Sequence, residues 1–174
     1  MQPLADRLAR GDDSAFAELY DACADRLHRY AAARLGSRDA ASDVVQTAFL
    51  RAVKSRRKFR KVESPAAYLF QIVRNETIRA ATRRKRHEQP INNNEPFSDA
   101  GHGVPNQEDA EALTAAVARL DAADQEIIEL KLHVGLTFAD IAAVLDRPQG
   151  TVATRYRRSL ETLRNWLQKE FTLD

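Results

Sequence analysis

The side chains best suited to a chemical task lie near the end of the chain, in the segment LTFADIAAVLDRPQGTVATRYRRSLETL at positions 136–163. The second half of this segment offers small, hydroxyl and guanidinium groups on one helix face: Ala153, Thr154, Arg155, Arg157 and Arg158, with Thr151 one turn earlier. Arginine can pair with guanine or bind phosphate, and small side chains let a helix approach base edges. This combination predicts a helix that reads double-stranded DNA in the major groove.

Two helices must hold these side chains in place, and local sequence features delimit both. Thr137 is a favourable N-cap, and Asp140 stands at the capping-box position with a shorter side chain than the usual glutamate. Asp146-Arg147-Pro148 ends the first helix, because proline disfavours a helical residue before it and suits a helix start after it. The pattern predicts a helix-turn-helix. An amphipathic hairpin with a solvated basic face is the alternative.

The first half of the chain holds two dense basic clusters with aromatic and amide side chains among them. The cations are Arg51, Lys54, Arg56, Arg57, Lys58, Arg60 and Lys61, then Arg79, Arg83, Arg84, Lys85 and Arg86; the other side chains are Phe59, Tyr68, Phe70 and Asn75. Basic residues follow phosphates, while aromatic faces and amides hold unstacked bases. A charged cluster alone is equally typical of a solvated surface. The combination favours binding of single-stranded or locally opened DNA.

Composition limits the class of protein. The chain has 174 residues, 30% of them charged and 44% hydrophobic, which indicates one globular domain or two small ones. Residues 1–86 carry 19 Lys/Arg against 10 Asp/Glu, whereas residues 87–111 carry six acids and no Lys or Arg. A basic domain is typical of nucleic-acid binding.

Several other classes are disfavoured. No apolar run is long enough to cross a membrane, and no signal-peptide pattern begins the chain. The single cysteine, Cys23, allows neither a disulfide framework nor a cysteine zinc site, and it falls on the apolar face of a helix. We therefore expect a cytoplasmic protein without a metal or cofactor, in which Cys23 is buried.

Apolar periodicity predicts an all-α protein with two small helical domains at residues 1–86 and 107–174, joined by a flexible acidic linker at residues 87–106. The predicted helix caps are Asp12 or Asp13, Ser37 or Asp39, Ser64, Asn106 and Asp121, with Gly11, Gly36 and Gly135 as stops. The expected inward-facing residues of the first domain are Phe16, Leu19, Tyr20, Cys23, Leu27, Tyr30, Leu35, Val44, Val45, Ala48, Phe49, Ala52, Val53, Leu69, Ile72, Val73 and Glu76. Those of the second are Ala110, Leu113, Val117, Leu120, Ile127, Leu130, Phe138, Ile141, Ala142, Leu145, Val152, Tyr156, Leu160, Leu163 and Leu167.

Three stretches, in this order and spacing, resemble the extracytoplasmic-function (ECF) sigma factors, the small specificity subunits of bacterial RNA polymerase. FAELYDACADRLHRYAAARLG followed by DAASDVVQTAFLRA resembles the first conserved domain of that family, and AAYLFQIVRNETIRAATRRKR resembles its helix for the minus-ten promoter element. The last stretch, from LDAADQEIIELK to RRSLETLR, resembles its reader of the minus-thirty-five element. The resemblance covers about residues 14–167. It implies a protein that binds core RNA polymerase, directs it to promoters and assists DNA opening, and that is not an enzyme.

The resemblance also implies roles for individual residues. Asp39, Asp43 and Gln46 would dock on the clamp helices of the polymerase β′ subunit, and the second domain would meet the β flap. Residues 60–64 resemble a pocket segment that receives a flipped promoter base, and Asn75 matches a promoter-contacting asparagine. The full set of predicted DNA-binding residues is Phe59, Arg60, Lys61, Tyr68, Asn75, Arg79, Arg83, Thr151, Ala153, Thr154, Arg155 and Arg158. The resemblance suggests an anti-sigma factor as a further partner, although no residue identifies one.

The chain departs from the family pattern at four positions. Tyr68 stands where the family usually has tryptophan, and Arg79 stands where it has aspartate, which adds a positive charge to the promoter helix. Asp146 and Arg147 replace the usual glycine and aliphatic residue in the helix-turn-helix turn. Aspartate tolerates the left-handed backbone better than most residues, so we expect the turn to form.

Two other functions remain as alternatives. A response-regulator-type activator has a similar helix-turn-helix, but it usually carries an α/β domain ahead of it, where this chain is helical and basic. A small nuclease or nucleotidyl enzyme would need metal ligands, a phosphate loop or paired carboxylates. The four histidines are scattered without ligand spacing, and no such motif stands out.

Overall fold

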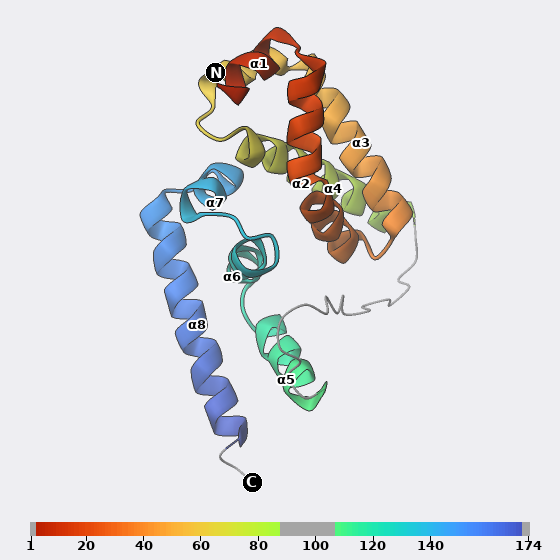
Figure 1. Cartoon of the computed structure of the whole chain (residues 1–174). Coiled ribbons are helices and arrows are strands. Elements are labelled where there is room, and N and C mark those ends of the chain that lie inside the picture. Colours follow the sequence, from red (N-terminus) through yellow and green to blue (C-terminus); the bar gives the residue numbers. More distant parts are fainter. Residues whose placement is uncertain (1–2, 88–106, 172–174) are drawn as a thin grey trace. The chain divides into compact units, whose positions relative to one another are not determined.

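The computed structural model describes residues 3–87 and 107–171, apart from the side chains of residues 87, 107–110, 170 and 171. Every regular element within these two ranges is helical, which confirms the all-α prediction (Figure 1). The helices form two compact units. The first contains α1 (Leu4–Arg10), α2 (Asp13–Leu35), α3 (Arg38–Lys54), the short helix η1 (Arg56–Lys61) and α4 (Pro65–His87).

Local capping sets the boundaries of the helices in the first unit. The Asp12 carboxylate accepts hydrogen bonds from the backbone N–H groups of Ser14 and Ala15, so Asp12, rather than Asp13, caps α2. Ser37 caps α3 in the same way by accepting from the Ala40 N–H. Gly36, at φ 60°, takes the left-handed conformation that ends α2. Ser64 caps α4, because its hydroxyl oxygen accepts from the Ala67 N–H.

The core of the first unit lies where α2, α3 and α4 pack against one another. Its buried side chains include Leu19, Cys23, Leu27, Tyr30, Val44, Val45, Ala48, Ala52, Leu69 and Val73. Burial raises the pKa of the Cys23 thiol, as expected of a core cysteine. Two predicted core residues are instead exposed: Tyr20, whose ring meets Phe49 edge-on, and Val53. Both stand at the margin of the apolar face, where periodicity alone cannot separate packed from open positions.

The second unit contains α5 (Gln107–Ala118), α6 (Ala122–Ile128), a single π-helical turn η2 (Glu129–His133), most of α7 (Phe138–Leu145) and α8 (Gln149–Phe171). Its core centres on Ala116, Ile128 and Leu163. Val117, Leu120, Tyr156, Trp166 and Leu167 pack against these three residues. The prediction that Leu113 and Leu160 face inward is wrong, because both are exposed.

The predicted linker at residues 87–106 lies outside the described residues except for position 87, as does the predicted Asn106 cap. The domain limits 1–86 and 107–174 therefore stay predictions. Within the described ranges, none of the helices has the length and apolar character needed to cross a membrane.

Candidate nucleic-acid interface

The helix-turn-helix forms at the predicted position. The Asp140 N–H donates to the Thr137 hydroxyl oxygen at 3.1 Å, and the Asp140 carboxylate accepts from the Thr137 N–H at 3.3 Å, so the capping box starts α7. Asp146 adopts the left-handed conformation at φ 52°, as expected for the residue that replaces glycine. The Arg147 N–H then donates to the Ala142 carbonyl at 3.0 Å and closes the turn before α8.

Aromatic and cationic contacts hold α7 against its neighbours in the second unit. The Phe138 ring meets the Tyr156 ring of α8 edge-on, with centroids 5.3 Å apart. The Lys131 ammonium of η2 lies 4.8 Å from the centroid of Phe138 and donates to the Leu136 carbonyl at 3.1 Å. The start of α7 is therefore fixed from η2 and from α8 at once.

The predicted DNA-binding residues of α8 differ in their exposure to solvent. Thr151 and Arg158 are exposed, whereas Ala153 and Thr154 are half-buried. Arg157 is exposed as well. Thr151, Thr154 and Arg158 form one row along α8, and Ala153 and Arg157 form a second row beside it, so the helix presents hydroxyl, methyl and guanidinium groups of the kind that read base edges.

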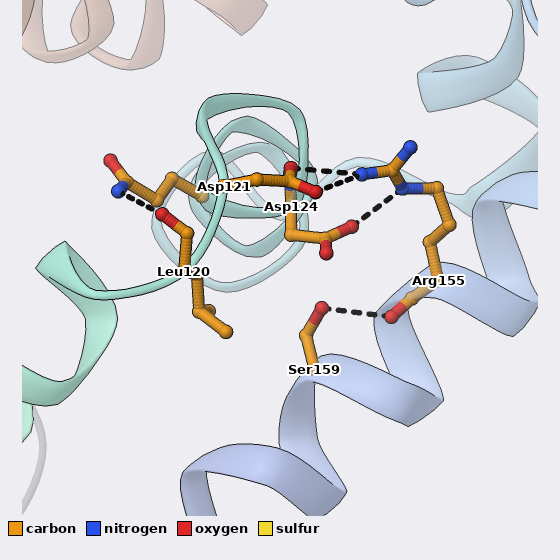
Figure 2. A network of polar contacts seen from close by, with 6 residues as sticks. Leu120, Asp121, Asp124, Arg155 and Ser159 are labelled. Atoms are coloured by element: carbon orange, nitrogen blue, oxygen red, sulfur yellow. Dashed lines mark hydrogen bonds and ion pairs between the residues drawn. The ribbon is translucent and has the colours of Figure 1, made fainter.

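Arg155 stands apart, because its side chain is bound within the second unit (Figure 2). Its Nε donates to the Asp124 carboxylate at 2.6 Å, and its Nη2 donates to both carboxylate oxygens of Asp121 at 2.8 Å. The hydrogen bond to Asp124 is the main cause of the raised pKa of Arg155. The sequence assigned Arg155 to the DNA-reading face and gave no indication of these two acidic partners.

Asp121 serves two purposes at the start of α6. Its carboxylate accepts the Asp124 N–H at 2.8 Å as the N-cap, and it also binds Arg155. The pKa of Asp121 lies below its usual value, first because of the hydrogen bond from the Asp124 backbone and then through the charge of Arg155.

The basic segment of the first unit places its cations outward and its aromatic residue inward. Arg60 and Lys61 of η1 are exposed, and their contact with DNA stays a prediction. Phe59 is fully buried, and its ring packs edge-on against those of Phe16 and Tyr68, with centroids 5.9 Å and 5.2 Å apart, respectively. This burial contradicts the prediction that the Phe59 ring contacts bases, because the η1 turn directs the ring into the core.

The other two aromatic residues of this region, Tyr68 and Phe70, are also partly or fully buried. Tyr68 is half-buried, and its hydroxyl lies 3.1 Å from the Ser55 Oγ, within hydrogen-bond distance. Phe70 is 1% exposed, with the Arg26 guanidinium 5.7 Å from its ring centroid, so Phe70 is not available to stack on bases. Of the three rings, Tyr68 alone keeps part of its surface open.

The predicted DNA-binding residues of α4 lie around a buried carboxylate, that of Glu76. Asn75, Arg79 and Arg83 are exposed, but Glu76 between them is 4% exposed. The Glu76 Oε1 lies 2.6 Å from Nη1 of Arg79 and 2.9 Å from Nη1 of Arg51 on α3. The sequence correctly placed Glu76 on the inward face of the helix. The i, i+3 spacing could have indicated the Arg79 pair, whereas the Arg51 contact depends on how α3 packs on α4.

The predicted polymerase-binding residues share one face of α3. Asp39, Asp43 and Gln46 are exposed and follow one another at spacings of four and three residues. Leu50, four residues after Gln46, is 57% exposed and extends this face with an apolar side chain. The carboxylates of Asp39 and Asp43 repel phosphate, so this face is better suited to contact with protein than with nucleic acid.

Comparison with protein families identifies both units. Residues 19–87 match the family model of Sigma-70 region 2, and residues 110–163 match that of Sigma-70, region 4. The match of the first unit to region 2 removes the response-regulator alternative, because that class would carry a different domain there.

Individual relatives agree with the family models. The chain is 30% identical to the ECF RNA polymerase sigma factor SigL of Mycobacterium tuberculosis, over 87% of this chain and 88% of that protein. It is 26% identical to the ECF sigma factor SigW of Bacillus subtilis, over 93% of this chain and 94% of SigW. It is 30% identical to the ECF sigma factor BldN of Streptomyces coelicolor over 94% of this chain, which spans 64% of the length of BldN.

Solved structures show the same fold. CnrH, solved in complex with the cytosolic domain of CnrY, matches with a TM-score of 0.67 at 23% identity, over 95% of this chain and 96% of that one. The sigma factor RpoE, solved with the anti-sigma factor NepR from Bartonella quintana, matches with a TM-score of 0.60 at 26% identity, over 88% and 96%. Together with the SigL identity and the two region models, this places the chain in the ECF sigma factors, which direct RNA polymerase to promoters.

Proposed function

We propose a division of labour between the two units. The first unit binds core RNA polymerase through α3 and the minus-ten element through η1 and α4, and the second unit binds the minus-thirty-five element through α8. The observation that carries this proposal is the separation of chemistry on the first unit: exposed acid, amide and leucine groups line α3, while exposed cations line η1 and the end of α4.

The α3 face is tested by polymerase capture. Changing Asp43 to alanine, or Gln46 to alanine, removes a polar contact from an exposed position, so we expect weaker retention on immobilised core polymerase with unchanged helical content. Asp25→Ala is the matched control, because it removes an exposed carboxylate from α2 instead. Equal retention of all variants and the wild type would count against the α3 assignment.

The second proposed surface, on η1 and α4, comprises Arg60, Lys61, Tyr68, Asn75 and Arg83. Cations at these positions would follow the backbone of an opened strand while Asn75 and the open part of Tyr68 meet bases. Asn75→Ala should therefore weaken holoenzyme binding to a promoter with an unpaired minus-ten region and spare a promoter with the same minus-thirty-five element alone. Equal loss on both DNAs would overturn the assignment of Asn75.

We further propose that this chain has an anti-sigma partner and acts in the cytoplasm without catalytic activity of its own. The likeness to RpoE, solved with the anti-sigma factor NepR, supports such a partner. The location follows from the function, because bacterial RNA polymerase and its promoters are cytoplasmic. Affinity purification of the full chain from cells tests the first part. We expect a co-purified protein that blocks the binding of this chain to core polymerase, and a chain purified without such a protein would count against the proposal.

A further inference from the structure

Arg155 occupies a position on α8 that its spacing leaves ambiguous. Successive residues of a helix turn by about 100°, so Arg155 lies between the buried side of α8, which includes Val152 and Ser159, and the open side, which includes Thr151 and Arg158. A side chain at such a boundary can turn either way. In this structure it turns toward α6.

The contacts of Arg155 occupy one of the two donor edges of its guanidinium. The Nε and Nη2 edge faces the carboxylates of Asp121 and Asp124 in a fork arrangement (Figure 2). Two negative charges within 3 Å also offset the attraction of the guanidinium for a DNA phosphate. Both features make Arg155 less suited to reading DNA than the exposed Arg158.

The same contacts fix α8 with respect to the rest of its unit. Arg155 links α8 to the N-terminus of α6, and the adjacent Tyr156 meets Phe138 at the start of α7. Neighbouring residues thus hold α8 from two directions. A fork between a guanidinium and carboxylates constrains orientation as well as distance.

We propose that Arg155 is a positioning residue: by binding Asp121 and Asp124 it sets the orientation in which α8 presents Thr151, Thr154 and Arg158 to the promoter. This inference rests on the proposed reading of the minus-thirty-five element by α8. It assigns base recognition to the exposed residues of α8 and removes Arg155 from the predicted DNA contacts.

The experiment compares holoenzymes made from the full chain and core polymerase. Affinity is measured on a duplex with the minus-thirty-five element, on a scrambled duplex, and on duplexes with one base pair of the element changed at a time. The readout is the ratio of specific to scrambled affinity, because removing charges near DNA changes both affinities together. Variants are Arg155→Gln, Arg155→Lys and the double variant Asp121→Asn/Asp124→Asn. Circular dichroism at the assay temperature confirms that each variant is folded.

A positioning role predicts that Arg155→Gln and Asp121→Asn/Asp124→Asn lower the ratio similarly, by roughly tenfold, which corresponds to about 1.4 kcal/mol. The order of preference among the changed base pairs should stay as in the wild type. Arg155→Lys should recover only part of the ratio, because lysine keeps the charge but not the fork. The matched control Arg164→Gln removes an exposed cation from α8 and should leave the ratio unchanged.

Two results would overturn the inference. In the first, Arg155→Gln abolishes discrimination at one base pair while the Asp121→Asn/Asp124→Asn variant keeps or raises the ratio, which would make Arg155 a direct reader. In the second, both variants keep the wild-type ratio, which would make the contacts irrelevant to recognition. A wild-type holoenzyme without preference for the element would instead refute the proposed role of α8 itself.

Discussion

The two units of this sigma factor contain charge clusters of opposite sign. In the first unit a single buried carboxylate, Glu76, binds two arginines, Arg51 and Arg79, whose side chains are 52% and 58% exposed. The cations outnumber the acid and keep half of their surface toward water. The cluster therefore anchors α3 to α4 and still displays positive charge at the surface.

The cluster of the second unit reverses these proportions. One arginine, Arg155, binds two carboxylates, and its side chain is 38% exposed. Here the acids outnumber the cation, so the fork of the arginine is occupied and the local charge is negative. In these two clusters, the side chains of the arginines are more exposed where a single acid is shared between them than where one arginine binds two acids.

The largest effect should follow from removing both cations of the first cluster. Arg51→Ala/Arg79→Ala removes both of these guanidinium partners from the buried Glu76 carboxylate, and we expect the first unit to lose about 2–3 kcal/mol of unfolding free energy. This is below the loss for fully buried pairs, because both arginines are half exposed. The only tryptophan, Trp166, packs in the second unit. The denaturation midpoint of the first unit, followed by circular dichroism, should therefore fall, while the midpoint followed by tryptophan fluorescence should stay unchanged.

A third substitution distinguishes the effect of an unpaired Glu76 charge from the effect of the packing lost with the two arginine side chains. In Arg51→Ala/Arg79→Ala/Glu76→Leu the buried group is apolar and needs no partner, so most of the lost stability should return. If the triple variant were no more stable than the double variant, the pairing of Glu76 would not be what holds α3 and α4 together.

The next effect tests the exposed arginine of α8 against the bound one. Arg158→Ala should reduce affinity for the minus-thirty-five element by about 1–3 kcal/mol if Arg158 contacts a base edge, with relaxed preference at one base pair. A phosphate contact would instead lower the slope of log affinity against log salt by about one, whatever the sequence. Anisotropy titrations of the holoenzyme at several salt concentrations distinguish the two contacts. Wild-type affinity at every salt concentration would show that Arg158 does not face DNA.

The features that sequence predicted well are those determined within a few residues. Caps at Asp12, Ser37, Asp121 and Thr137 depend on a side chain reaching backbone groups two or three positions away. The left-handed turn at Asp146 is local in the same sense. The all-α fold and the helix-turn-helix were accessible because such local rules act at each helix end.

The features that sequence missed depend on partners far along the chain. Arg155 is bound by residues 34 and 31 positions earlier, and nothing within α8 indicates that these acids face it. Phe59 lies among seven cations, so its neighbours suggested a surface position, yet its ring packs between Phe16 and Tyr68. Charge density along a segment therefore predicts a basic surface correctly and the direction of each side chain poorly.

The smallest effect concerns the acid side of the second cluster. Asp121→Asn keeps an equally good N-cap for α6 but removes the negative charge beside Arg155, so we expect slightly lower thermal stability of the second unit at neutral pH. The pKa of Asp121 in the folded chain lies below its ordinary 3.8. The contribution of the ionised carboxylate is therefore complete well above pH 3.8, and it is lost as the pH falls past 3.8 and through the lower folded pKa.

The melting temperature reported by Trp166 should thus differ between the wild type and Asp121→Asn by a constant amount above pH 5, which is roughly one unit above the ordinary aspartate pKa. This difference in melting temperature should shrink as the pH is lowered below 5. Asp140→Asn, at the capping box of α7, is the matched control, since it also removes a capping carboxylate but none that binds Arg155. If the melting temperature of the wild type instead rose relative to that of Asp121→Asn as the pH fell, the charge of Asp121 would oppose folding. The second cluster would then destabilise its unit rather than support α8.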